Sequence, residues 1–357
     1  MSFNVQPLPP RNLNESNVVL RKLTTAHRYL AELKGVAATI PNQEILINTL
    51  ALQEAKDSSA VENIITTHDE LYKAQLLAAD FQTAATKEVE SYAEALKRGF
   101  ALVKKNRILT ANHILEIQKC LEKNDAGFRK LAGTALVNDI TGETVYTPPQ
   151  DYETVVRLMD NLVEYVNRGD LHDADPLVKM AVIHFQFESI HPFYDGNGRA
   201  GRIINILYLV LEGLLSIPIL YLSRYVIRNK AEYYRLLQSV RDTGEWEAWI
   251  LYMLDAVEQT ARETIVLVEG IKNLMMDTKT RIRAEHPKIY SQDLINNLFR
   301  HPYTKIEFLV DDLKVSRLTA TKYLDTLAEN GFLVKEKVWR VNYYVNQPLF
   351  NLLKGDG

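Results

Sequence analysis

Residues 191–202 read HPFYDGNGRAGR, and the segments on both sides of this stretch have the apolar periodicity of helices. The loop Asp195-Gly-Asn-Gly198 contains two glycines, which allow backbone amides to approach a ligand closely. A helix is expected directly after the loop, so its free N–H groups and the positive end of its dipole face the same place. This arrangement predicts an anion site, and phosphate is the usual anion.

Charged side chains surround the predicted anion site. Arg199 and Arg202 are three residues apart in the first helical turn, so they share one helix face and add positive charge. Asp195 beside a polyphosphate is suited to hold Mg²⁺ together with phosphate oxygens and waters. His191, at the end of the preceding helix, could accept a proton from a hydroxyl that attacks phosphorus. Together these groups predict phosphoryl or nucleotidyl transfer, which depends on positioning and charge neutralisation.

Each group also has a purely structural interpretation. A histidine at a helix end can interact with the helix dipole, and an Asp-Gly or Asn-Gly pair is often a simple turn. Two arginines at this spacing can form a solvated face. Their conjunction within one short stretch favours the functional interpretation.

The pattern His191-Pro-Phe-x-Asp195-Gly-Asn-Gly-Arg199-x-x-Arg202 resembles the signature of Fic proteins at every fixed position. The resemblance implies the helical Fic fold and, most commonly, transfer of AMP from ATP to a Tyr, Thr or Ser hydroxyl of a target protein or of the enzyme itself. It implies that His191 is the base and Asp195 the Mg²⁺ ligand. Asn197 and the amides of Gly196 and Gly198 would organise the α-phosphate. Arg199 and Arg202 would bind the β- and γ-phosphates.

Further nucleotide-site residues are implied by the same resemblance. Ala200 and Gly201 lie between the two arginines and belong to the expected nucleotide-binding stretch. Tyr233 and Tyr234 resemble a tyrosine pair that family members place near the nucleotide base. The alternative for this pair is core packing in an amphipathic helix, and the sequence does not decide between the two.

A short alternating stretch over residues 135–146 predicts a β-hairpin inside a helical protein, because it surrounds a Thr-Gly pair and ends before two prolines. This hairpin resembles the flap of Fic proteins, which binds the backbone of the target by strand pairing. Ile140, Val145 and Tyr146 are therefore expected to contact the target protein.

Residues 58–63 read SSAVEN and resemble the inhibitory pattern of the family, in which a Ser or Thr is followed four residues later by Glu and then by Gly or Asn. The resemblance implies that Ser58, Glu62 and Asn63 form a brake. Glu62 would enter the nucleotide site and pair with Arg202, which would keep the γ-phosphate of ATP from binding productively.

The same stretch also matches a capping box. In that interpretation Ser59 is the N-cap of a helix that runs through Leu77, and Glu62 bonds back to the helix start. The two roles compete for one carboxylate, so a structure can distinguish them.

Helical periodicity dominates the rest of the chain, and a mainly α fold is expected. We expect an N-terminal helical region with the inhibitory motif over residues 1–107 and a Fic core over 108–255. A connecting helix over 256–285 and a winged helix-turn-helix domain over 286–357 complete the expected organisation. Within the core, the helical pattern is predicted to continue from about Ile108 to Val137.

The expected winged helix allows a second class of function, a DNA-binding regulator that senses nucleotide. Its third helix carries Arg317 and Lys322, and Lys335, Lys337 and Arg340 could contact phosphates from the wing. Neighbouring acidic residues dilute this basic character. Protein docking or formation of a homodimer is the alternative role of the module.

The composition, with 46% hydrophobic and 24% charged residues, is that of a globular protein, and the net charge of −3 indicates no general attraction to nucleic acid or membranes. A single cysteine, Cys120, excludes an internal disulfide and a cysteine-rich metal site. No secretory signal or membrane span is predicted, so a cytoplasmic location is expected.

Related enzymes transfer UMP, phosphocholine or phosphate, or remove AMP. Asp195 and the paired arginines favour ATP with Mg²⁺ over these alternatives.

Overall fold

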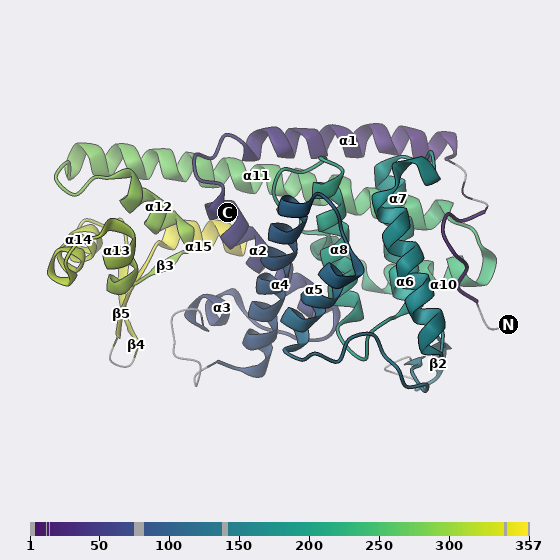
Figure 1. The fold of residues 1–357 in the computed structure, drawn as a ribbon. Helices are drawn as coiled ribbons and strands as arrows, with labels where there is room; N and C mark the ends of the chain where they lie inside the picture. Colours follow the sequence, from purple (N-terminus) through teal and green to yellow (C-terminus); the bar gives the residue numbers. More distant parts are fainter. Residues whose placement is uncertain are drawn as a thin grey trace.

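The computed structural model of the chain describes residues 4–11, 13, 15–74, 82–137, 142–338 and 341–355. Most of these residues are in α-helices, and the strands form two small antiparallel sheets (Figure 1). The mainly α fold expected from the periodicity is therefore confirmed. Within the described ranges, no helix combines the length and apolar character that a membrane crossing requires.

Two long helices lie side by side along one edge of the molecule. Helix α1 (Asn17–Ala37) packs along α11 (Glu247–Glu285), which is 39 residues long (Figure 1). The contact is apolar because the buried positions of α1, from Val19 to Ala37, recur at helical spacing.

The centre of the molecule is a pair of buried helices, α7 (Pro176–Ile190) and α8 (Asn197–Leu211), which pack against each other. Every residue of α7 from Leu177 to Ile190 is buried, so this helix is surrounded by the core on all sides. The surrounding helices are α2 (Glu44–Val61), α4 (Ala84–Asn106), α5 (Ala111–Glu122), α6 (Tyr152–Asn167), α9 (Leu222–Arg228) and α10 (Lys230–Thr243). The HPFYDGNGRAGR stretch therefore connects two helices that the rest of the core holds in place.

The capping-box interpretation of residues 58–63 is wrong. Ser58 and Ser59 belong to the last turn of α2, and a separate short helix, α3 (His68–Ala74), follows. The Glu62 amide donates to the Ser59 carbonyl at 3.0 Å rather than to its hydroxyl. Asn63 then takes the left-handed conformation, with φ of 62°, which ends the helix. Leu77, the expected helix end, lies outside the described residues.

The predicted continuation of the helix from Ile108 to Val137 is also wrong. Helix α5 ends at Glu122, because Lys123 is left-handed with φ of 53°. An irregular segment leads from there to the predicted hairpin, which is formed by β1 (Leu136–Val137) and β2 (Thr144–Tyr146). A short 3₁₀ turn, η2 (Gly169–Leu171), follows α6.

The C-terminal module contains the three helices and the hairpin that the sequence predicts. Its elements are α12 (Gln292–Arg300), β3 (Tyr303–Thr304), α13 (Ile306–Leu313), α14 (Arg317–Glu329), β4 (Val334–Val338), β5 (Val341–Val345) and α15 (Gln347–Lys354). The strand order is β3-β5-β4, and this arrangement is compatible with a winged helix. Strand β3 and helix α15 were not predicted. Helix α15 packs on α11, where Gly270 makes room for Leu352.

Candidate active site

The loop between α7 and α8 is shaped by left-handed residues and by one buried side chain. His191 (φ 49°) ends α7, and Gly196 (φ 74°) precedes the first residue of α8. The Asn197 side chain accepts from the Phe193 amide at 2.8 Å and donates to the Phe193 carbonyl at 2.9 Å. Its polar atoms therefore brace the loop, and a ligand would meet the backbone N–H groups of the first turn of α8. Phe193 is buried and so anchors the loop in the core.

His191 is half-buried where α7 ends. Burial, followed by the positive charges of Arg129 and Arg241, lowers the pKa of His191 to about 4. The imidazole is therefore neutral near pH 7, which is the form that can accept a proton.

Arg129 is a residue of this site that the sequence did not reveal. Its side chain is 1% exposed, and its Nε donates to the His191 carbonyl at 2.8 Å. It lies in the irregular segment after α5, for which a helix was expected. Nothing in the local pattern distinguished it from a surface arginine.

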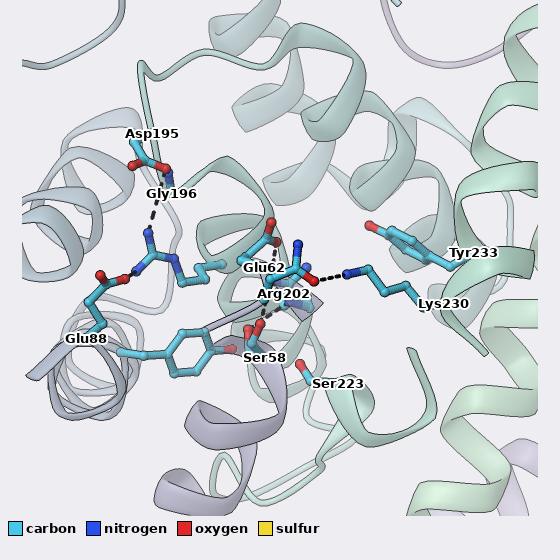
Figure 2. A network of polar contacts seen from close by, with 12 residues as sticks. Ser58, Glu62, Glu88, Asp195, Gly196, Arg202, Ser223, Lys230 and Tyr233 are labelled. Atoms are coloured by element: carbon cyan, nitrogen blue, oxygen red, sulfur yellow. Dashed lines mark hydrogen bonds and ion pairs between the residues drawn. The ribbon is translucent and has the colours of Figure 1, made fainter. Parts of the chain in front are cut away.

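Arg202 is held by the end of α2. It is 1% exposed, and its Nε donates to Ser58 Oγ at 2.8 Å while Nη2 donates to the Ser58 carbonyl at 3.0 Å. Nη2 also lies 2.7 Å from Glu62 Oε1 (Figure 2). Burial alone would raise the pKa of Glu62, but the positive charges of Arg202, Arg199 and Lys230 together more than offset this and hold the pKa below its usual range. The ion pair implied by the inhibitory pattern is thus present in this structure.

The Glu62 carboxylate also lies against the glycine loop. A Cβ atom added at Gly198 would overlap Glu62 Oε1 and would come 3.0 Å from Arg202 Nη1. The carboxylate therefore fills the space that the glycine leaves open beside the first turn of α8. Asn63, the third residue of the pattern, accepts from Lys230 Nζ at 2.9 Å and so connects the end of α2 to α10.

Arg199 is paired with carboxylates from two other helices, which the sequence did not reveal. Its Nη1 lies 2.9 Å from Glu88 Oε2 of α4, and its Nη2 lies 2.8 Å from Glu122 Oε1 of α5. Asp195 is farther away, at 3.8 Å. A Cβ added at Gly196 would come 2.5 Å from Glu122 Oε1, so this carboxylate lies directly against the loop. Both motif arginines are therefore neutralised within the chain.

Asp195 differs from these carboxylates because its side chain is 79% exposed. Its Oδ1 accepts from the Gly196 amide at 2.6 Å, which fixes the carboxylate at the loop. Such a group fits Mg²⁺, which takes few protein ligands and completes its shell with phosphate oxygens and waters. Among the described residues, no group of three or more His, Cys, Asp or Glu side chains is arranged to hold a metal ion.

Other residues expected at the nucleotide face the core. Ala200 is buried, and Gly201 packs on α7, where an added Cβ would come 2.9 Å from Glu188 Oε1. Tyr233 is 2% exposed and its hydroxyl lies 2.8 Å from His184 Nε2, so the core-packing alternative describes this ring. Its hydroxyl nevertheless points toward the Glu62–Arg202 pair (Figure 2). Tyr234 is 46% exposed, so its ring is accessible.

The two described flap residues point in different directions. Val145 is exposed on β2. Tyr146 is buried, its hydroxyl donates to the Ser189 carbonyl at 2.7 Å, and the Arg241 guanidinium lies 4.0 Å from its ring centre. Tyr146 therefore anchors the flap to α7. Ile140 lies outside the described residues.

The basic residues of the C-terminal module that were expected to meet DNA are partly neutralised. Arg317 Nη1 lies 2.7 Å from Glu307 Oε1, and Lys335 Nζ lies 2.6 Å from Asp325 Oδ1. Arg340 lies outside the described residues. These pairs reduce the positive charge that a phosphate backbone would meet.

Three family models match the chain in succession. They are Fic/DOC family N-terminal over residues 20–101, Fic/DOC family over 108–209, and the C-terminal domain of SoFic-like protein adenylyltransferases over 274–349. Together they extend over most of the chain, and the central model contains the HPFYDGNGRAGR stretch.

Curated relatives are similar at low identity. Protein adenylyltransferase fic-1 of Caenorhabditis elegans is 27% identical over 142 residues, which is 40% of this chain and 27% of that protein. A probable protein adenylyltransferase of Aquifex aeolicus is 29% identical over 202 residues, which is 55% of this chain and 56% of that protein. The chain thus spans between about a quarter and about half of the length of these relatives.

Solved structures share the fold. A Fic family protein from Desulfovibrio desulfuricans has a TM-score of 0.57 at 19% identity, covering 95% of this chain and 98% of that chain. A Fic domain containing signaling protein from Bacteroides thetaiotaomicron has a TM-score of 0.54 at 18% identity, covering 68% of this chain and 95% of that chain.

Proposed function

Because the chain belongs to the Fic/DOC family, we propose that it is a protein adenylyltransferase that transfers AMP from ATP to a Tyr, Thr or Ser hydroxyl. The target is another protein or the chain itself. The observation that carries the proposal is the joint placement of a neutral His191, the glycine loop at the start of α8 and two buried arginines. The names of the curated relatives support the same activity.

The proposed reaction is an in-line displacement at the α-phosphorus of ATP. The target oxygen forms a bond to this phosphorus while the bond to the pyrophosphate oxygen breaks. His191 accepts the hydroxyl proton, and the amides at the start of α8 neutralise charge on the phosphate oxygens. Arg199 and Arg202 bind the β- and γ-phosphates, which become the leaving pyrophosphate.

Asp195 would hold Mg²⁺, which supplies additional neutralisation of the phosphate charge when it is bound. The exposure of this carboxylate at the edge of the loop supports the assignment. The flap strand β2 would pair with an extended segment of the target, and the exposed side of Val145 supports this role.

The same geometry supports a restrained ground state. Glu62 pairs with Arg202 and lies against Gly198, so a γ-phosphate and the Glu62 carboxylate would compete for one position. Two anions at one position repel each other, and ATP must therefore displace the carboxylate before Arg202 can bind phosphate. Ser58 and Asn63 hold the end of α2 in the position that brings Glu62 to the site.

The proposal is tested by the position of the transferred label. The Glu62→Gly variant is incubated with ATP carrying ³²P at either the α- or the γ-phosphate, with Mg²⁺ and a cell lysate as the source of targets. AMP transfer labels protein from the α-position only, and His191→Ala in the same background removes the signal. Label from the γ-position would instead show phosphate transfer. UTP labelled at the α-position serves as the control for nucleotide choice.

A further inference from the structure

The C-terminal end of α7 is capped by side chains that come from the flap and from the segment before it. The last carbonyls of a helix have no partner within the helix, and here they lie next to the base. The Ser189 carbonyl accepts from the Tyr146 hydroxyl at 2.7 Å, and the Ile190 carbonyl accepts from Arg129 Nη2 at 3.3 Å. The His191 carbonyl accepts from Arg129 Nε at 2.8 Å.

Arg129 also contacts the flap. Its Nη2 donates to the Pro149 carbonyl, three residues beyond the end of β2, and its own amide donates to the Pro192 carbonyl at 2.9 Å. One guanidinium therefore joins the chain after the flap to the left-handed turn that carries His191. In the described part of the chain no carboxylate lies within ion-pair distance of Arg129, so backbone carbonyls alone satisfy this buried cation.

A buried guanidinium without a carboxylate partner is costly, and simple packing would not require it. Its position at the negative end of the α7 dipole offsets part of this cost, and its donors are accepted by two carbonyls from the end of α7 and by the Pro149 carbonyl. The planar fork of arginine can meet several carbonyls in fixed directions, which the single ammonium of lysine cannot do. The arrangement therefore specifies a geometry between the flap and the end of α7.

We propose that Arg129 is a positioning residue for the transfer reaction, because it fixes the flap and the His191 turn as one unit. The proposal rests on the proposed function. A target strand paired with β2 then presents its hydroxyl at a set distance from the imidazole. Arg129 itself does not touch the reacting atoms; it acts through the backbone of His191 and of Pro149.

The charge of Arg129 has a second consequence for His191. The charged groups that face His191 are Arg129, Arg241 from α10 and Glu62 from the end of α2. After burial, which is the largest effect, the two arginines lower the pKa of His191 and Glu62 raises it. Removal of the Arg129 charge is therefore expected to raise the pKa of His191.

The test compares Arg129→Lys and Arg129→Gln in the Glu62→Gly background, with Arg157→Gln as the matched control. Arg157 is an exposed arginine of α6, so its loss removes one charge without touching the flap or α7. Both Arg129 variants should lower kcat by about 10- to 100-fold, because a displaced base and target lose their alignment. KM for ATP should stay within about twofold, since Arg202 and the glycine loop are unchanged.

Two measurements made without turnover complete the test. Proton NMR titration of the His191 imidazole, assigned with His191→Ala, should show a higher pKa in Arg129→Gln and a smaller change in Arg129→Lys, which keeps the charge. Amide hydrogen exchange over residues 144–150 should be faster in both variants, because the flap loses its tie to α7. Arg157→Gln should change none of these quantities.

Unchanged kcat and unchanged exchange in Arg129→Lys and Arg129→Gln would overturn the proposal. A loss of ATP binding in parallel with kcat in both variants would also overturn it, because Arg129 would then support the fold in general. If the Glu62→Gly parent transfers no AMP, the proposed function fails. The titration and the exchange data would still decide whether Arg129 joins the flap to the base.

Discussion

Replacement of Glu62 by glycine removes the carboxylate that occupies the position proposed for the γ-phosphate. Arg202 then loses its 2.7 Å contact with Glu62 Oε1 but keeps its bonds to the hydroxyl and carbonyl of Ser58. The space beside Gly198 opens at the same time. The variant should therefore bind ATP productively more often, and it should unfold more easily because Arg202 loses its only carboxylate partner among the described residues.

The free energy lost when the Glu62–Arg202 ion pair is removed depends on how exposed the two side chains are. Breaking a fully buried ion pair costs ~3–5 kcal/mol, whereas an exposed pair contributes ~0–1 kcal/mol. The Arg202 side chain is 2% exposed and the Glu62 side chain 34%, so we discount the buried value to about 2 kcal/mol. For an equilibrium between paired and free Arg202, about 2 kcal/mol corresponds to a shift of about 30-fold.

The assay is the initial rate of AMP incorporation from α-labelled ATP at limiting ATP concentration. Glu62→Gly should increase this rate by about 10- to 100-fold. Glu62→Gln, which keeps the side-chain size but loses the charge, should give a smaller increase. A double variant with His191→Ala should be inactive. The reasoning is refuted if Glu62→Gly is folded, shows the lower free energy of unfolding, and still transfers AMP at the rate of the unaltered chain.

Three further predictions follow from the charges around the site. Glu122→Gln removes one of the two carboxylates that pair with Arg199, so ATP should bind several-fold more tightly in isothermal titration calorimetry; an unchanged affinity would show that Arg199 does not meet phosphate. Because burial and two arginines lower the pKa of His191 to about 4, the acid limb of the kcat profile should lie well below pH 6.5, and a limb at the ordinary histidine value would count against His191 as the base. Burial raises the pKa of Glu54 from 4.5 to about 8, so the folded chain keeps a proton that the unfolded chain releases, and stability should fall as the pH rises between these values. Glu54→Gln cannot ionise, so its melting temperature relative to the unaltered chain should increase from pH 5 to pH 8; a difference that does not depend on pH would contradict the assignment.

The local part of the site could be predicted from the sequence because its determinants lie within one short stretch. The glycines, the following helix and the order of His191 and Asp195 are all encoded between residues 191 and 202. Because α8 begins at Asn197, helical geometry places Arg199 and Arg202 on one face near the loop. Their proximity to the loop therefore also follows from the local sequence. The partner of Arg202 came from the resemblance of residues 58–63 to an inhibitory pattern, and its separation of 140 residues gave no local signal.

The site residues that the sequence did not reveal lie far from the motif along the chain. Arg129 is 62 residues from His191, and its role depends on where the irregular segment after α5 leads. Glu88 and Glu122 lie on amphipathic helices, where the sequence spacing does not distinguish a carboxylate that pairs with Arg199 from one that faces solvent. The false helix after Glu122 has a similar cause, since apolar spacing continued while left-handed Lys123 had already ended the helix.

The charges of the motif explain why binding and restraint use the same residues. Arg199 and Arg202 are almost fully buried, and a buried guanidinium is costly unless partners balance its charge in every stable state of the protein. Without nucleotide the anions are carboxylates from α2, α4 and α5, all of which precede the motif in the chain. With nucleotide, under the proposed function, phosphate oxygens would replace them. Glu62 lies just beyond the last residue of α2 and is the carboxylate that pairs with Arg202, so under the proposed function its displacement sets the restraint.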